Sequence, residues 1–156
     1  MLELIVSQIH KLLLKNNLTI AVAESCTGGL VSSLLTQAPG SSGYFILGVV
    51  VYSNVSKNKI LSIPNKLIEE KGAVSKQVAA KLAESVRKIA GADFGIGITG
   101  IAGPTGATPN KPVGTVFISI AARKKTICKE FHFTGNRTTI RKKSALKSLE
   151  LLLIQL

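Results

Sequence analysis

The segment from Ala23 to Gly29, which reads Ala-Glu-Ser-Cys-Thr-Gly-Gly, contains side chains from which a nucleophilic site can be built. A short apolar run before it predicts a strand, and the apolar spacing of Leu30 to Leu35 predicts a helix after it. A hydroxyl and a thiol therefore lie at a strand-to-helix turn, where the first N–H groups of the helix lack partners and glycines allow close approach. Such a turn can receive an oxyanion or a phosphate, although Ser and Thr are also ordinary helix N-caps.

Ser25, the candidate nucleophile, needs a base to take its proton. The two histidines, His10 and His132, come without an orienting carboxylate, which disfavours a Ser-His-Asp arrangement. A lysine can serve where burial lowers its pKa. The segment Tyr52 to Lys57 begins at the carboxyl end of a predicted strand, where open α/β sheets bind ligands. With 20 Lys and Arg in the chain, the residues alone leave open whether Lys57 is this base or a solvated charge.

Three further motifs were candidates for chemistry. Cys26 is a rival nucleophile because a helix start lowers the pKa of a thiol; the alternative is a small buried residue. The segment Gly95 to Gly100 has the spacing of a dinucleotide-binding turn, but its first two glycines fall inside a predicted strand and no helix follows. The segment Gly103 to Lys111 lacks the Gly-Lys-Ser/Thr ending of a phosphate-binding P-loop.

The elements that position these residues follow from hydrophobic periodicity. Strands are predicted at residues 18–23, 45–52, 94–98, 113–121 and 126–133. Helices are predicted at residues 2–15 and 30–35, after Asn54, from the N-cap Ser75 to Gly91, and from about Thr138. The alternation predicts an α/β fold, a three-layer α/β/α sandwich with a mixed sheet of about five strands.

Two segments have more specific expectations. Phe45 to Tyr52 is a continuous apolar run, typical of a strand covered on both faces, and its Gly48 predicts a bulge or a close approach. The segment Gly100 to Pro112 is a long loop that contains three prolines. A long loop inside a compact domain is usually functional, so we expect this one to form a wall of the site.

Length and composition limit the function classes. The chain has 156 residues, so residues 1–156 are expected to form a single domain. The apolar content of 46% excludes a disordered chain. No apolar stretch has the length of a membrane-spanning helix and the N-terminus lacks a signal-peptide pattern, which predicts a cytoplasmic protein without membrane contact. Two isolated cysteines predict free thiols, with no metal and no cofactor.

The net charge of +12 favours an anionic partner. Residues 123–156 hold nine Lys and Arg against two acids, but the aromatic content of 4% supplies few stacking platforms. No DNA-binding motif spacing occurs either, so a nucleic-acid partner is not expected. A solvated basic face is favoured, in which Arg137 and Arg141, four residues apart, grip the phosphate of a small ligand together.

Several segments, in their order and spacing, resemble the CinA C-terminal domain family, the PncC-type nicotinamide-nucleotide amidohydrolases. The resemblance covers roughly residues 5–150. The segments that carry it are Ala23 to Gly29, Tyr52 to Lys57, Gly72 to Ser75, Thr99 to Pro104, Lys111 to Gly114 and Gly135 to Arg137. Larger proteins of this family carry an additional pyrophosphatase-like domain, and this chain resembles the standalone form. One departure is Asn136, where the family more often has an acid.

The resemblance implies hydrolysis of nicotinamide mononucleotide to nicotinic acid mononucleotide and ammonia, without a metal. Carried onto this chain, Ser25 is the nucleophile and Lys57 is the base. The resemblance also implies that Tyr52 orients Lys57 or contacts the substrate. It assigns substrate binding to further residues: Thr27, Gly28, Gly29, Thr99, Gly100, Gly103, Arg137 and Arg141.

A second function class stays open from the sequence, namely a nucleotide-binding or nucleic-acid-associated protein that keeps the pocket without catalysis. The presence of both Ser25 and Lys57 favours the amidohydrolase, because binding alone needs neither residue. The resemblance also implies a homo-oligomer, for which the leucine-rich first and last helices offer surfaces.

Overall fold

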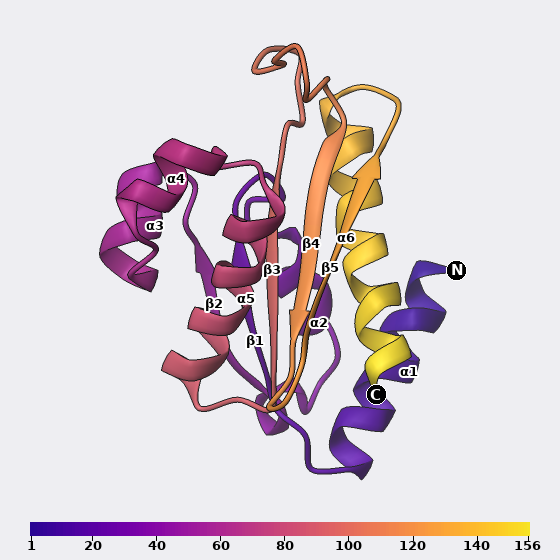
Figure 1. Ribbon diagram of the computed structural model, residues 1–156. Helices are drawn as coiled ribbons and strands as arrows, with labels where there is room; N and C mark the ends of the chain where they lie inside the picture. The colour runs from indigo at the N-terminus through magenta and orange to yellow at the C-terminus, as the bar shows by residue number, and fades with distance from the viewer.

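Five strands form one mixed sheet in the order β2-β1-β3-β4-β5 (Figure 1). The computed structural model describes residues 1–156. The strands are β1 Ile20–Glu24, β2 Phe45–Val50, β3 Phe94–Gly100, β4 Thr115–Ala121 and β5 Thr126–His132. Strand β1 pairs in parallel with β2 and β3, whereas β4 is antiparallel to both β3 and β5. The predicted mixed five-stranded sheet is confirmed.

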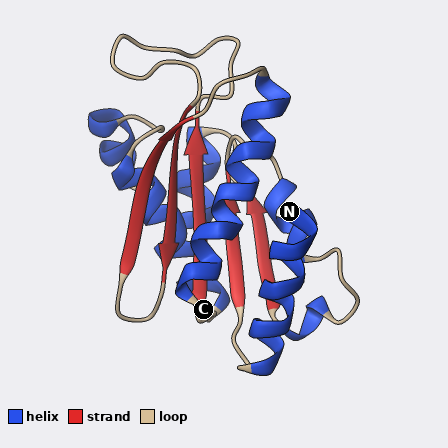
Figure 2. Ribbon diagram, turned by 90° about the vertical axis from the view of Figure 1, so that its right-hand side faces the viewer, coloured by secondary structure: helices blue, strands red, loops and turns tan.

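Helices cover both faces of the sheet and complete three layers, as Figure 2 shows with α6 crossing in front of the strands. The helices are α1 Leu2–Lys15, α2 Leu30–Leu35, α3 Asn54–Leu61, α4 Asn65–Lys71, α5 Lys76–Ala90 and α6 Arg137–Gln155, with a short 3-10 turn at Ser41–Gly43. One apolar core lies between the sheet and helices α1, α2 and α6. A second core on the opposite face includes side chains of α3, α4 and α5. None of these helices combines the length and apolar character needed to cross a bilayer.

The local signals for α5 are confirmed at both ends. The Ser75 hydroxyl oxygen accepts a hydrogen bond from the Val78 N–H, and Gly91 closes the helix with a φ of 63° in the left-handed region. Gly95 and Gly97 allow the same helix to lie close against β3. A Cβ at Gly97 would stand 2.4 Å from the Ala79 carbonyl oxygen, so these glycines serve packing rather than dinucleotide binding.

Strand β2 differs from its prediction. It forms an edge of the sheet, and its residues alternate between half-buried and exposed, with Ile46 and Val50 about half exposed. The expectation that both faces are covered is therefore wrong. The expected close approach at Gly48 is confirmed, because a Cβ there would lie 2.6 Å from the Ser32 Oγ.

The parallel strands bring distant segments to one edge of the sheet. Strands β2, β1 and β3 run in the same direction, so their carboxyl ends lie together. The Ser25 turn follows β1, α3 follows β2, and the loop between β3 and β4 follows β3. Helix α6 begins beside this edge, which gathers the predicted site segments in one place (Figure 1).

Candidate active site

The backbone around Ser25 is fixed by both neighbouring strands. The Val51 N–H donates to the Glu24 carbonyl oxygen at 2.9 Å, and the Ser25 N–H donates to the Ile98 carbonyl oxygen at 3.0 Å. These bonds extend the parallel pairing of β1 past its last residue. Ser25 is only 8% exposed, so its hydroxyl is presented from a rigid and largely dry position.

Lys57 lies against this hydroxyl. Helix α3 begins directly after β2, with its first turn capped by the Ser53 hydroxyl, which accepts from the Ser56 N–H. The Lys57 Nζ hydrogen-bonds to the Ser25 Oγ at 3.2 Å and donates to the Tyr52 carbonyl oxygen at 3.1 Å. The lysine is 2% exposed, so the solvated surface charge that the sequence left open is excluded.

The electrostatics of the pair favour a lysine base. Burial lowers the pKa of Lys57, because the charged ammonium loses its hydration. A Cys26 thiolate would raise this pKa, but burial raises the pKa of Cys26 itself to about 12, which leaves the thiol protonated and uncharged near neutral pH. A neutral thiol is a poor nucleophile, so the site favours Ser25 over the rival Cys26.

This assignment predicts that Cys26 reacts slowly with thiol reagents. In a Cys128→Ser variant, which leaves Cys26 as the single cysteine, native protein at pH 7 is expected to react with iodoacetamide on the order of 10³-fold more slowly than free cysteine. The same protein unfolded in guanidinium supplies the control and should react at the ordinary rate. Rapid modification of the folded protein would show a thiolate at the turn.

Glu24 is a functional candidate that the sequence reasoning missed. Its fully buried carboxylate accepts hydrogen bonds from the N–H groups of Gly29 and Val31 at 3.1 Å, and from the N–H and hydroxyl of Ser32 at 2.8 and 2.7 Å. The position of an acid directly before the turn was the available signal. These hydrogen bonds show that the Glu24 carboxylate, and not a ligand, pairs with the N–H groups at the start of α2.

The expected anion site at the start of α2 is corrected accordingly. Gly29 donates to Glu24, and the Gly28 N–H donates to the Ser25 carbonyl oxygen at 3.1 Å. The N–H groups of Cys26 and Thr27 have no acceptor on another residue. Both residues directly follow Ser25 in the chain, but Thr27 is fully buried, so the Cys26 N–H is the backbone donor that remains for an oxyanion.

Arg141 also differs from its expected role. Its guanidinium donates to the Thr27 carbonyl oxygen at 2.8 Å, and a Cβ at Gly28 would stand 3.2 Å from its Nη2. The arginine therefore braces the Ser25 turn from α6 and does not line the pocket. The paired grip of Arg137 and Arg141 on one phosphate is not what the structure provides.

A pocket of about 310 Å³ opens beside the Ser25–Lys57 pair. The residues that line it come from the ends of β1 and β3, from α3, from the loops, and from the start of α6: Ser25, Cys26, Tyr52, Asn54, Lys57, Ala73, Val74, Thr99, Gly100, Ile101, Ala102, Gly103, Thr105, Gly106 and Arg137. Of the residues predicted from the sequence, Thr27, Gly28, Gly29 and Arg141 are outside this lining. Both histidines are outside it as well, and no group of three or more potential metal ligands gathers anywhere in the structure.

Arg137 and Tyr52 close one side of the pocket. The Arg137 guanidinium donates to the Tyr52 hydroxyl at 2.7 Å and to the Gly103 carbonyl oxygen at 3.0 Å. Asn136 caps α6 by accepting from the Thr139 N–H, so the amide performs the capping that an acid would also perform. Tyr52 thus acts twice, since its carbonyl holds Lys57 and its ring lines the pocket.

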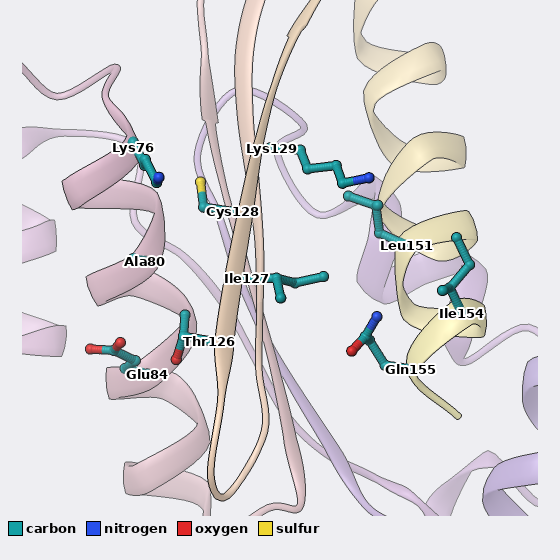
Figure 3. Close-up of a pocket in the computed structure, with 10 residues that line it drawn as sticks. All are labelled: Lys76, Ala80, Glu84, Thr126, Ile127, Cys128, Lys129, Leu151, Ile154 and Gln155. Carbon is teal, nitrogen blue, oxygen red and sulfur yellow. The ribbon is translucent and has the colours of Figure 1, made fainter.

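A larger hollow of about 590 Å³ lies elsewhere, over the edge strand β5 between α5 and α6 (Figure 3). Figure 3 shows Cys128 on the α5 side of the strand and Lys129 on the α6 side. Burial raises the pKa of Cys128 to about 11, so its thiol stays protonated and unreactive near neutral pH. Size alone therefore does not mark the candidate active site, because the contact between Ser25 and Lys57 lies at the smaller pocket.

The fold and the site define an α/β domain with a buried serine–lysine pair at the carboxyl edge of its parallel strands. The chain belongs to the CinA C-terminal domain family, whose pattern matches residues 2–156. It is similar to a crystal structure of a competence-damaged protein (CinA) superfamily protein from Escherichia coli, with a TM-score of 0.96 and 33% identity over 100% of this chain and 91% of that one. A competence/damage inducible protein from Agrobacterium tumefaciens is similar at a TM-score of 0.95 and 34% identity, covering 98% and 94% of the two chains.

Curated relatives include longer proteins. A CinA-like protein of Geobacter metallireducens is 44% identical over 148 residues, which cover 95% of this chain and 36% of the relative. A CinA-like protein of Koribacter versatilis is 53% identical over 133 residues, or 85% of this chain and 32% of the relative. The chain thus spans about a third of the length of the relatives it matches.

Proposed function

We propose that this chain hydrolyses the carboxamide of nicotinamide mononucleotide, giving nicotinic acid mononucleotide and ammonia. The observation that carries the proposal is the buried contact of 3.2 Å between the Lys57 Nζ and the Ser25 Oγ at the wall of a pocket. A hydroxyl in contact with an amine of lowered pKa is the arrangement of an activated serine nucleophile. The family of the chain is consistent with an amidohydrolase.

The first half of the reaction forms an ester on Ser25. Neutral Lys57 takes the hydroxyl proton while the Ser25 Oγ bonds to the carboxamide carbon. The carbonyl oxygen becomes an oxyanion, for which the N–H of Cys26 at the pocket wall is the available backbone donor. The carbon–nitrogen bond then breaks, and the Lys57 ammonium gives its proton to the leaving nitrogen, which departs as ammonia.

The second half releases the acid. Lys57, neutral again, takes a proton from a water molecule that attacks the ester carbon. When the tetrahedral intermediate collapses, the bond to the Ser25 Oγ breaks and the lysine returns its proton to that oxygen. The product leaves as the carboxylic acid, which releases its proton to solvent and becomes the carboxylate, and both residues regain their starting states.

The pocket also supports a phosphorylated aromatic substrate. Its lining contains the cationic side chain of Arg137 and no carboxylate, so it favours an anionic group. The Tyr52 ring on the same wall offers an aromatic face to a pyridinium ring. We place the 5′-phosphate at Arg137, which would exchange its contact with the Tyr52 hydroxyl for the phosphate oxygens.

The direct test is product analysis. Purified wild-type chain incubated with nicotinamide mononucleotide is expected to release ammonia and nicotinic acid mononucleotide in equal amounts. Binding of the nucleotide without release of ammonia, over a range of pH and concentration, would contradict the proposal and favour the non-catalytic nucleotide-binding alternative.

Phosphate recognition by Arg137 gives a second prediction. Arg137→Met keeps an apolar stem and removes the charge, so KM for the nucleotide is expected to rise about 10- to 100-fold, the equivalent of one charge-assisted contact. KM for nicotinamide riboside, which lacks the phosphate, should change little. Lys142→Met on the exposed face of the same helix is the matched control. Equal losses for nucleotide and riboside would contradict the assignment.

A further inference from the structure

The buried carboxylate of Glu24 is not used by the proposed chemistry, yet it adjoins the nucleophile. Glu24 is the last residue of β1, and Ser25 follows it immediately. All four groups around the carboxylate are donors: three backbone N–H groups and the Ser32 hydroxyl. A carboxylate can accept from all four groups through its two oxygens, and an amide side chain, which has one acceptor oxygen, cannot reproduce this.

These bonds join the end of β1 to the beginning of α2 and span the Ser25 turn. The turn between them includes Gly28 and Gly29, both with positive φ, and glycine backbone is conformationally permissive. Without an anchor, this segment has alternative backbone conformations at small energetic cost. The Glu24 carboxylate holds one side of the turn, and Arg141 holds the other through the Thr27 carbonyl oxygen.

The same bonds decide which N–H groups face the reaction. Gly29, Val31 and Ser32 would otherwise present unpaired donors at the start of a helix, where an anionic substrate group can bind. Their donors are occupied, so the N–H of Cys26, which lines the pocket, is left for the oxyanion. A phosphate group of the substrate therefore cannot bind to these N–H groups at the start of α2.

We propose that Glu24 is a positioning residue whose buried carboxylate fixes the turn between β1 and α2, and with it the direction of the Ser25 hydroxyl and of the free N–H group of Cys26. The inference rests on the proposed function for its effect on turnover. Its effect on the intrinsic reactivity of Ser25 is independent of which amide is hydrolysed.

The test compares Glu24→Gln with wild type in two assays. One assay is the rate at which phenylmethylsulfonyl fluoride labels Ser25, followed by mass spectrometry. The other is ammonia release from nicotinamide mononucleotide, expressed as kcat per Ser25 that can be labelled, which corrects for any unfolded fraction. In the folded variant we expect both rates to fall at least about 30-fold while KM changes less than about threefold.

A purely structural role would lower the thermal midpoint and the labelled fraction but leave kcat per labelled site near the wild-type value, and this result would overturn the proposal.

If Glu24→Gln fails to fold, Ser32→Ala is the deciding variant, because it removes one of the four groups that donate to the Glu24 carboxylate. It is expected to slow both rates about threefold relative to Ser33→Ala, whose side chain is exposed and does not contact Glu24. Equal labelling and turnover rates for Ser32→Ala and Ser33→Ala would then overturn the proposed role of Glu24.

The two proposals fail in different ways. If wild type releases no ammonia but Glu24→Gln still slows the labelling of Ser25, the proposed function is wrong and the role of Glu24 stands. If wild type is active and a folded Glu24→Gln is equally active, the function stands and the role of Glu24 is wrong.

Discussion

Ser25→Ala is expected to lower kcat for ammonia release by about 10³-fold or more, equivalent to ~4 kcal/mol in the activation barrier. The loss is large because the Ser25 Oγ forms the covalent bond in the proposed reaction, and no other reactive group occupies its place. Cys26 is next in the chain, but burial raises the pKa of its thiol to about 12. The measurement is steady-state ammonia release, with nucleotide binding followed separately by calorimetry.

The variant should still bind the nucleotide with nearly unchanged affinity, since Arg137 and the pocket walls remain. Cys26→Ala is the matched control at the same turn and should keep kcat within about tenfold of wild type. An active Ser25→Ala together with an inactive Cys26→Ala would show that the thiol is the nucleophile. A twofold effect of Ser25→Ala would not support catalysis by this residue.

Lys57→Met should reduce kcat by about 10²- to 10⁴-fold, the usual contribution of a positioned general base. Methionine keeps the length and much of the volume of the buried side chain but cannot take a proton. Lys57→Arg should not restore activity, because a guanidinium remains protonated at every pH at which proteins are stable. Activity of the arginine variant near the wild-type level would exclude proton transfer at this position.

The pH dependence tests the same assignment. Only the neutral amine accepts the Ser25 proton, so kcat/KM of wild type is expected to rise with pH through the pKa of Lys57 and then level off. Because burial lowers this pKa below its ordinary value of 10.5, the rise should lie on the acidic side of 10.5. The residual activity of Lys57→Met should lack this rise. A rate that falls as the pH increases would contradict a lysine base.

The free energy of unfolding shows whether a loss of activity in Lys57→Met comes from the missing amine or from misfolding. A pKa that is lower in the folded protein means that folding disfavours the charged amine, at a cost that is complete below the folded-state pKa and fades as the pH rises toward 10.5. The variant is therefore expected to exceed wild type in the free energy of unfolding at neutral pH, as is common when a buried functional group is removed. Urea unfolding from pH 6 to pH 10 should show this difference shrinking.

Much of the fold was predictable because its signals are local. The capping residues Ser75 and Gly91, the apolar periodicity of α1 and the basic turn of the final hairpin each depend on neighbouring residues, and the structure has all of them. The apolar run of β2 predicted a strand correctly. Its exposure was not predictable, because the position of a strand at the edge of a sheet depends on the order in which all strands pair.

From the amino-acid sequence we could predict the alternating elements, the strand-to-helix turn that carries Ser25, and, through the family resemblance, the pairing of this serine with Lys57. The folded structure was needed to show that the two side chains are in contact and that Glu24 accepts from the N–H groups at the start of α2. It was also needed to show that Arg137 lines the pocket while Arg141 braces the turn. The physical reason is that residue type and spacing encode local conformation. Burial, pKa and hydrogen-bond partners arise from segments that meet only when the sheet is assembled.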